Sequence, residues 1–375
     1  MVEWKKIGEV CSRVFAGGTP NTKREDYYDG DIPWIRSGEI DFNVISTAER
    51  YITALGYENS SARKIRKNSV VMAMTGATVA KTAVVSFETT ANQSVCALET
   101  DDSLVNYKYL YYYLAENYFM IKSSAQGALT SLNLSMIKDI TIPIPSLSEQ
   151  QRIVDILDTF TASNDNLKEQ IELRRKQYEH YRDQLLNFEG IEGVEMKTLG
   201  DIGEVCMCKR ILKEQTSDNG DIPFFKIGTF GGKANSYISR ALFEEYKTNY
   251  SYPQKGEILI SASGTIGRSV IFDGKDAYFQ DSNIVWIAND EKFVTNKYLY
   301  YFYQIAEWKT DGGTIKRLYN YNLKNTPIPI PSLSEQHRIV SILETFESSI
   351  HNMEAQLAQR QKQYEYYRNR LLSFE

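Results

Sequence analysis

Loops that mix basic, amide and aromatic side chains are the segments of this sequence with the clearest chemical capacity. They are GGTPNTKREDYYDG and SARKIRK in the N-terminal half, and CKRILKEQ and GTIKRLYNYN in the C-terminal half. Arginine, lysine, asparagine and glutamine can form paired hydrogen bonds with base edges, and lysine and arginine also hold phosphates. The loops therefore favour recognition of nucleic acid, and the alternative for any single residue is a solvated loop position.

A phosphate-binding loop is not predicted. TGATVAKT at 75–82 is similar to one, but it has one residue too few before its lysine, and alanine replaces the second glycine. The corresponding C-terminal segment reads SGTIGRS and lacks the lysine. We expect instead a turn between two strands that presents Lys81 in one half and Arg268 in the other.

Metal and catalytic motifs are also missing from the sequence. Cys206 and Cys208 form a single CxC without a second pair, which is too few ligands for a structural zinc. No HExxH or GxSxG pattern occurs, and His180, His337 and His351 do not correspond between the halves. We expect no metal and no cofactor in this chain.

Composition and charge are those of an ordinary folded protein. Hydrophobic residues make up 42% of the chain, and no apolar run approaches the ~18–20 residues of a membrane helix. Without a signal peptide, and with unpaired cysteines, a cytoplasmic location is expected. The net charge of −5 argues mildly against nucleic acid. Much of the acidic excess, however, lies in 146–189 and 332–375.

The sequence repeats itself. IPIPSLSEQ occurs at Ile142–Gln150 and again at Ile328–Gln336. Ile142–Glu189 aligns without a gap to Ile328–Glu375, with 30 of 48 positions identical. Upstream, GDIPWIRSGEI is echoed more weakly by GDIPFFKIGTF. The chain thus consists of two tandem copies of a repeat of about 190 residues, which implies a pseudo-twofold molecule.

Each repeated stretch predicts a long helix. Ser146 followed by Glu149 is a capping-box pattern, and the second copy repeats it. The first apolar stripe follows a four–three rhythm through Ile153, Leu157, Phe160, Leu167, Ile171, Tyr178, Tyr181, Leu185 and Phe188, with Asn164 and Arg174 in its gaps. Helices of ~43 residues would be about 65 Å long and would pair as a left-handed coiled coil. Arg174 and Arg360 share a seam position, for which a structural role is favoured.

The remaining segments, 1–145 and 190–331, are mixed. Short β-rich runs such as SVVMAMTG and EILISASG alternate with turns, and one Tyr-rich helix is expected late in each, at Asn106–Phe119 and Asn296–Glu307. The predicted fold class is α+β, with an α/β domain in each segment and the long helices at 146–189 and 332–375.

These features together resemble the DNA-specificity subunit of type I restriction-modification systems. IPIPSLSEQQRIVDIL is similar to that family's constant-region signature, and GGTPNTKREDYYDGDIPWIRSGEI to its domain-opening motif. TGATVAKT with NQSV (Asn92–Val95) resembles its mid-domain turn and strand. The second half departs from the opening motif, since it carries CMCKRILKEQTSDNG. A different half-site is therefore expected there.

The resemblance implies two target-recognition domains, at 1–145 and 190–331, that each read one half of a bipartite, asymmetric DNA target. The helices would pair antiparallel and set the half-site spacing. The implied partners are double-stranded DNA, two adenine-N6 methyltransferase subunits and ATP-dependent restriction subunits, in a prokaryotic cytoplasm. S-adenosylmethionine, ATP and Mg²⁺ would be bound by those partners, and this chain would catalyse nothing itself.

Side-chain chemistry and the resemblance give a set of expected DNA contacts. They are Thr19, Asn21, Lys23, Arg24, Arg36, Lys64, Arg66, Lys67, Lys81, Asn92 and Gln93 in the first domain, and Lys209, Arg210, Lys226, Arg268, Asn283, Lys316 and Arg317 in the second. Two rival classes stay open: a coiled-coil scaffold without a DNA role, and an enzyme with a site built from the Tyr-rich helices.

Overall fold

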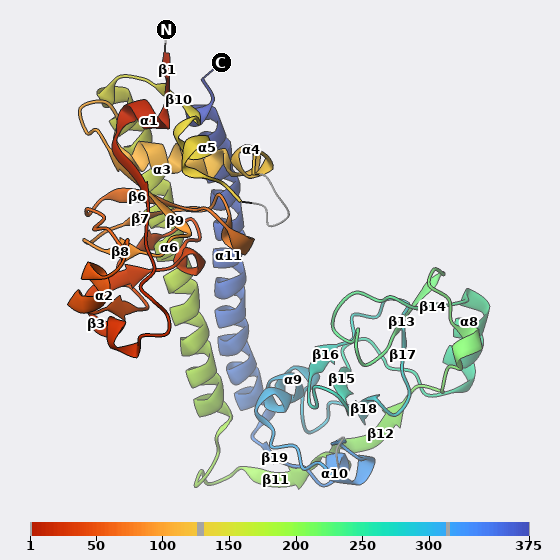
Figure 1. Cartoon of the computed structure of the whole chain (residues 1–375). Coiled ribbons are helices and arrows are strands. Elements are labelled where there is room, and N and C mark those ends of the chain that lie inside the picture. The colour runs from red at the N-terminus through yellow and green to blue at the C-terminus, as the bar shows by residue number, and fades with distance from the viewer. Residues whose placement is uncertain (1, 126–130, 313–315, 375) are drawn as a thin grey trace. The chain divides into compact units, whose positions relative to one another are not determined.

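The chain folds into two compact units in the computed structural model, which describes residues 2–125, 131–312 and 316–374. The first unit holds the described residues up to Lys168 together with those from Ala355 onward. The second unit is the continuous stretch Glu169–Glu354. Each unit therefore combines one divergent segment with one half of each long helix (Figure 1).

The elements of the first copy of the repeat are β1 (Glu3–Lys6), α1 (Ile7–Val10), β2 (Cys11–Ala16), η1 (Glu25–Tyr27), β3 (Tyr28–Ile35), η2 (Ser37–Glu39), β4 (Val44–Ile45), β5 (Tyr51–Ile52), α2 (Ala54–Glu58), β6 (Ser69–Ala73), η3 (Gly76–Thr78), β7 (Thr82–Val85), β8 (Thr90–Ala91), β9 (Val95–Thr100), α3 (Tyr107–Glu116), α4 (Tyr118–Ser123), α5 (Leu134–Lys138), β10 (Thr141–Ile144) and α6 (Leu147–Leu186).

The elements of the second copy are β11 (Glu195–Thr198), α7 (Leu199–Ile202), β12 (Gly203–Met207), η4 (Lys213–Gln215), β13 (Ile222–Phe225), β14 (Tyr237–Ile238), α8 (Arg240–Asn249), β15 (Ile258–Ser261), β16 (Ser269–Ile271), β17 (Tyr278–Phe279), β18 (Ile284–Asn289), α9 (Asn296–Ile305), α10 (Asn320–Lys324), β19 (Pro327–Ile330) and α11 (Leu333–Leu372). Their order parallels that of the first copy, apart from η2, β4, η3 and α4, which have no counterpart among the described elements of the second copy.

The sheets of the two units follow one plan. In the first unit a five-stranded sheet has the order β2-β9-β6-β7-β4, and a three-stranded sheet has the order β5-β3-β8. The second unit has β12-β18-β15-β16 and β14-β13-β17. In the three-stranded sheets the last pair, β3 with β8 or β13 with β17, is parallel. The mixed α/β architecture expected from the sequence is confirmed.

Both faces of the main sheet are buried in each unit, because successive strand residues point to opposite sides. In the first unit Val70 and Met72 pack toward α3 and the long helices, while Val71 and Ala73 pack into the core on the other face. In the second unit Ile258 and Ile260 face α9 in the same way, whereas Leu259 contributes to the opposite core. The sheet is thus held firmly between its smaller partner sheet and the helices.

The repeated phrase begins as a strand. β10 pairs antiparallel with β1, and β19 pairs antiparallel with β11, so the start of each domain lies beside its end. Proline can be accommodated there because a two-stranded ribbon leaves one backbone edge unpaired. The Ser146 hydroxyl then accepts the Glu149 amide of α6. The Glu149 carboxylate, however, is bonded to Arg152. The hydroxyl half of the predicted capping box is confirmed, but the carboxylate pairs within the helix.

The long helices pair antiparallel within each unit. In the first unit Phe160 stacks on Tyr367 with ring centroids 5.4 Å apart, and Ser163, later on α6, accepts a hydrogen bond from Arg360, earlier on α11. In the second unit Tyr181 stacks on Phe346, also at 5.4 Å. The Arg174 guanidinium lies 5.6 Å from the centre of the Phe346 ring, so the seam arginine is a structural partner there.

The helix ends differ slightly from prediction. α6 and α11 each span 40 residues and end before Phe188 and Phe374. The Phe374 ring still packs edge-on against Tyr109, at 6.4 Å. The Tyr-rich segment Asn106–Phe119 is not one helix, because α3 ends at Glu116 and α4 begins at Tyr118. Among the described residues, no helix is long and apolar enough to cross a membrane.

Candidate nucleic-acid interface

The opening loop of the first unit is held rigidly against a neighbouring turn. A Cβ atom on Gly17 would lie 2.2 Å from the Ala91 carbonyl oxygen, so only glycine permits this approach. The Thr19 hydroxyl donates a hydrogen bond to the Gln93 side chain. The structure therefore brings together Thr19 from the opening motif and Gln93 from the NQSV turn. We call the opening loop and the NQSV turn, joined by this hydrogen bond, the first-unit loop surface.

The remaining polar residues of this surface shape its turns. Asn21 accepts the Lys23 amide at 3.0 Å through its side-chain oxygen, and Asn92 accepts the Ser94 amide at 3.2 Å. These are turns closed by the side chain of their first residue. The Lys23 side chain is exposed.

Most of the basic residues predicted in the first unit form ion pairs. Arg24 bonds Asp26 through two nitrogens, at 2.6 and 2.8 Å. The partners of the other four are Glu49 for Arg36, Glu88 for Lys64, Asp102 for Arg66 and Asp41 for Lys81, at 2.5–3.0 Å. A phosphate would have to compete with a carboxylate at each of these positions.

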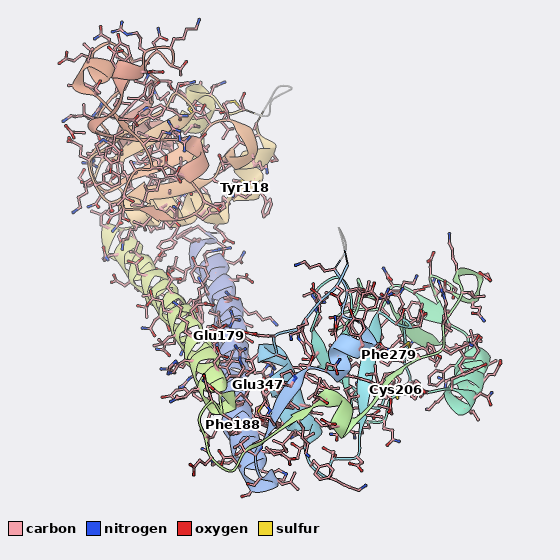
Figure 2. All side chains as sticks on the ribbon, turned by 90° about the horizontal axis from the view of Figure 1, so that it is seen from below. Tyr118, Glu179, Phe188, Cys206, Phe279 and Glu347 are labelled. Atoms are coloured by element: carbon pink, nitrogen blue, oxygen red, sulfur yellow. The ribbon has the colours of Figure 1, made fainter. Side chains whose placement is uncertain are left out.

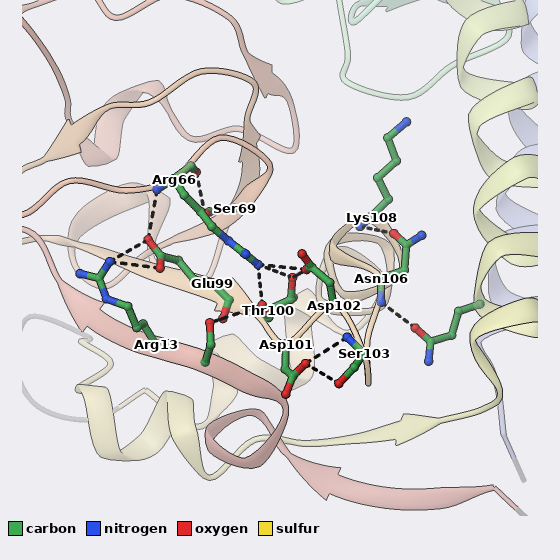
Figure 3. Close-up of polar contacts among 12 residues, drawn as sticks. Arg13, Arg66, Ser69, Glu99, Thr100, Asp101, Asp102, Ser103, Asn106 and Lys108 are labelled. Carbon is green, nitrogen blue, oxygen red and sulfur yellow. Dashed lines mark hydrogen bonds and ion pairs between the residues drawn. The ribbon is translucent and has the colours of Figure 1, made fainter.

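The SARKIRK segment shows the arrangement most clearly (Figure 3). The Arg66 guanidinium donates to Asp102 and to the Thr100 side chain, while the Arg66 amide donates to the nearly buried Glu99. Arg13 reaches the same Glu99 carboxylate at 3.2 Å. Lys67 is exposed and contributes, with Arg66 and Asp102, to a pocket of about 370 Å³. The segment thus combines a structural arginine with a solvent-facing lysine.

The predicted basic residues of the second unit are held differently. Lys209 lies 4.8 Å from the centre of the Tyr250 ring, and Lys226 lies 5.9 Å from that of Phe224. Arg268 donates to the Phe230 carbonyl oxygen at 2.9 Å. Arg210 is exposed. Within the part of the chain that the structure describes, none of these four side chains has a carboxylate partner within ion-pair distance.

Three turns of the second unit converge around the predicted residues. Ser263 donates to the Asn283 side chain at 2.9 Å, which links the SGTIGRS turn to the start of β18. Arg317 donates to the backbone and the hydroxyl of Ser282, at 2.7 and 2.8 Å. Lys316, beside it, is exposed. Arg268, Asn283 and Arg317 therefore lie on one cluster of turns, and Arg268 lines a pocket of about 210 Å³ there.

The two segments that superficially resemble a phosphate-binding loop are turns between strands, at the positions predicted from the sequence. Residues 75–82 run from β6 through η3 into β7, and Lys81 bonds Asp41 at 2.5 Å. In the second unit Gly267 adopts a left-handed φ of 84°, and a Cβ there would lie 2.2 Å from the Trp308 ring nitrogen. Both are strand-to-strand turns, as the sequence predicts.

An exposed aromatic pair lies beside Arg317, in the GTIKRLYNYN loop, but neither of its tyrosines is among the DNA contacts expected from the sequence. The Tyr319 and Tyr321 rings are stacked, with centroids 6.0 Å apart, and they are 43% and 56% exposed. The Arg317 guanidinium lies 6.0 Å from the centre of the Tyr319 ring. The alternation of tyrosine with asparagine in LYNYN was the available signal, because it places both rings on one side of a short turn.

The Tyr-rich helices have a structural role rather than the arrangement of an active site. Tyr109 and Tyr298 are fully buried and donate to the Pro143 and Pro329 carbonyl oxygens, at 2.9 and 3.0 Å. Burial raises the pKa of both phenols, which keeps them protonated as donors. Further along, Tyr301 donates to Glu347, which lies on α11 (Figure 2).

A second surface, which the sequence did not predict, lies on the helix pair. In the second unit a groove of about 640 Å³ is lined by Arg174, Gln177, Tyr181, Gln184, Leu185, Arg338, Ile342 and Phe346. The equivalent positions of the first unit carry the same residue type in seven of these eight cases, Arg370 replacing Gln184. Tyr181 and Tyr367 are 44% and 42% exposed. We call the groove of the second unit, together with the equivalent residues of the first, the duplicated groove.

Comparison with known proteins identifies the family to which this architecture belongs. The model of the type I restriction modification DNA specificity domain matches residues 1–173 and again 191–360. The chain therefore belongs to the family of type I restriction-modification specificity subunits, which are non-catalytic proteins of DNA sequence recognition that act with modification and restriction subunits.

Individual relatives are named as specificity subunits of the same kind. A Haemophilus influenzae protein named as a type I restriction enzyme specificity subunit is 46% identical over 100% of this chain and 96% of its own length. The Escherichia coli EcoR124I/EcoR124II specificity subunit is 32% identical over 50% of this chain and 48% of its own. Among solved structures, the specificity subunit of M. genitalium has a TM-score of 0.58 at 16% identity, covering 100% of this chain and 97% of that one.

Proposed function

We propose that this chain reads a bipartite, asymmetric DNA target, one half with each unit. The observation that carries the proposal is the contrast within the repeat, where the helices are nearly constant but the opening loops differ completely. A chain that carried one specificity twice would not need two different loops. Each long helix contributes one half to each unit, which also favours a fixed distance between the half-sites.

The surfaces described above support direct contact with the duplex. Exposed Lys23, Lys67, Lys209, Arg210 and Lys316 suit phosphate oxygens, which position a protein on DNA without specifying its sequence. The amides of Asn21, Asn92, Gln93 and Asn283 suit base edges. The exposed tyrosines beside Arg317 provide an apolar surface of the kind that contacts thymine methyl groups in the major groove.

Partner docking is the second part of the proposal. Seven of the eight residues that line the groove of the second unit recur at the equivalent positions of the first, including its aromatic residues and its arginines. Two copies of one partner therefore fit better than two different partners, and the methyltransferase subunit is the partner that the family uses in modification. Such a complex would bind S-adenosylmethionine in the methyltransferases, and ATP and Mg²⁺ in the restriction subunits, in a prokaryotic cytoplasm. This chain would hold none of them.

The test of bipartite reading is the methylation pattern of a host that expresses this chain with its modification subunit. Long-read sequencing should reveal adenine methylation at one motif that consists of two short defined parts and a spacer of fixed length. A contiguous motif would contradict the proposal. A matched host with the modification subunit alone is the control.

The test of docking uses Tyr181→Ala and Tyr367→Ala. Each variant should lose one methyltransferase copy in native mass spectrometry, and the double variant should lose both. Leu173→Ala is the matched control, because Leu173 is 58% exposed on α6 and does not line the groove. If the double variant still carries two methyltransferase copies, the groove is not the docking surface.

A further inference from the structure

One buried glutamine occurs in each copy of the repeated phrase, and both make the same three hydrogen bonds. The Gln150 Nε2 donates to the Leu104 and Pro145 carbonyl oxygens at 3.0 and 2.9 Å, and its Oε1 accepts the Asn106 amide at 2.8 Å. The side chain is fully buried. It therefore joins three backbone segments at one point.

Gln336 repeats this arrangement in the second unit. Its Nε2 donates to the Phe293 and Pro331 carbonyl oxygens at 2.8 and 2.9 Å, and its Oε1 accepts the Thr295 amide at 2.8 Å. It is also fully buried. The two units thus share this contact although their sheets and loops differ in sequence.

The glutamine contacts lie where a Tyr-rich helix meets a long helix in each unit. Asn106 and Thr295 are the N-cap residues of α3 and α9, the Tyr-rich helices on which each main sheet packs. Gln150 and Gln336 lie in the first turn of α6 and α11. Each glutamine therefore connects the N-terminus of α3 or α9 to the N-terminus of α6 or α11. We call α6 and α11 the spacer helices.

Further contacts extend the fastening along the helices. Eight residues after Gln150, Asp158 binds Lys108 at 2.5 Å and accepts the Tyr112 hydroxyl at 2.7 Å. Eight residues after Gln336, Glu344 binds Lys297, also at 2.5 Å. These ion pairs are partly exposed and thus tolerate small movements of the domain helix relative to the long helix. The glutamine contacts are buried and do not tolerate such movements.

We propose that Gln150 and Gln336 are positioning residues that fix the angle of each recognition domain on its spacer helix. They would thereby set the separation and the rotational phase at which the two half-sites are read. This inference rests on the proposed bipartite function. A change of one base pair in the spacer moves a half-site by ~3.4 Å and turns it by about 34°. A domain held by a defined angle should reject that change, and a loosened domain should accept it.

The sharpest variant is Gln150→Glu. Its side chain has the same shape and can still accept the Asn106 amide, but it places an oxygen against the Leu104 and Pro145 carbonyl oxygens. Gln150→Met keeps the approximate length without any charge, and it serves if the glutamate variant does not fold. Gln361→Glu is the matched control, since Gln361 is exposed on α11. Gln336→Glu applies the same test to the second unit.

The measurement is binding of the reconstituted complex with its modification subunits to duplexes that hold both half-sites with the native spacer or one pair more or less. We expect Gln150→Glu and Gln150→Met to lose roughly tenfold in spacer discrimination, the size of effect of one mismatched base pair. Discrimination against base changes inside either half-site should stay as in the wild type.

The outcomes separate the two proposals. If the wild type shows no spacer preference at all, bipartite reading itself fails. If the wild type prefers one spacer and folded Gln150 and Gln336 variants keep that preference in full, the positioning role is wrong. A variant that loses base and spacer discrimination together would show a general structural role, which also overturns the inference.

Discussion

The two units differ least where the spacer helices pair and most where the loops would meet DNA. In the helical part the Tyr–Phe stack recurs in both units, at the same centroid distance of 5.4 Å. In the recognition loops the first unit pairs its arginines and lysines with carboxylates, whereas the second places them over aromatic rings or on backbone carbonyls. The contrast shows that the paired helices are alike in the two units, whereas the loops expected to contact DNA differ both in sequence and in the partners of their basic side chains.

The largest expected effect comes from exchanging a whole reading surface. Replacement of residues 1–145 by the corresponding domain of another specificity subunit should change one half of the methylated motif completely. The other half should remain intact, because each domain packs on its own half of the helix pair. Long-read sequencing of methylated adenine measures this. A simultaneous change of both halves would show that the units do not read independently.

The constant frame can be tested by lengthening it. One added heptad in the middle of each helix should preserve the seam and extend it by ~10.5 Å. The preferred spacer should then grow by about three base pairs, and the affinity should fall because those pairs also turn the second half-site by roughly 100°. Binding to a series of synthetic spacers is the measurement. A folded variant that keeps the original spacer would exclude a helical ruler.

The difference in ion pairing of their basic side chains predicts that the two units contribute unequally to phosphate binding. Substitution of Lys209, Arg210 and Lys226 by glutamine should weaken binding to all sequences and flatten the salt dependence, by about 0.9 in log–log slope for each phosphate that is no longer neutralised. The same change of Lys64, Arg66 and Lys67 should have a smaller effect, since Lys64 and Arg66 already hold carboxylates.

Binding of the complex to random duplex DNA between low and moderate salt measures both slopes. Lys362→Gln on α11 is the control, because it removes an exposed charge away from the loops. Thermal melting of each variant checks that the fold is kept. A larger decrease from the first-unit set would reverse the comparison.

The smallest expected effect concerns the core. Burial raises the pKa of Glu257, whose first-unit counterpart is Ser69. An acid with a raised folded-state pKa contributes stability that is present below its unfolded pKa and lost as the pH rises through the folded value. Glu257→Gln should therefore match the wild type near about pH 4 and exceed it by roughly 1 kcal/mol or less near pH 8.

Chemical denaturation at both pH values, with exposed Glu245→Gln as control, measures this difference. Glutamine keeps an oxygen for the Gln254 amide, which donates to Glu257 at 2.6 Å, so the loop contact is retained. Equal stability of variant and wild type at the higher pH would show that burial of the charge costs nothing here.

The periodic parts of the fold could be predicted from the sequence. The long helices were predicted to within three residues of their ends, and Asn164, placed in a gap of the stripe, is buried at 7% exposure. The turn at 75–82 also followed from its spacing. These features depend on residues close together in the chain, where period and turn chemistry decide the structure.

The long-range pairings could not be predicted in this way. Asp41 and Asp102 neutralise Lys81 and Arg66 from 40 and 36 residues away, and no local pattern connects them. The role of Gln150 was equally hidden, because its partners Leu104 and Asn106 lie 46 and 44 residues upstream. The predicted set of DNA contacts remains a prediction, although the structure brings several of its members into common surfaces.

The discontinuity of the first unit has a consequence for biosynthesis. That unit needs the residues from Ala355 onward, whereas the second unit is the uninterrupted stretch Glu169–Glu354. Domains fold during translation once their own residues have been made. The second unit can thus close as soon as it leaves the ribosome, but the first must wait with the apolar side of α6 uncovered. Pulse proteolysis of released chains that stop at residue 354 should find the unit Glu169–Glu354 protected and the N-terminal unit still open to cleavage. The half of the chain that is synthesised first is the half that is finished last.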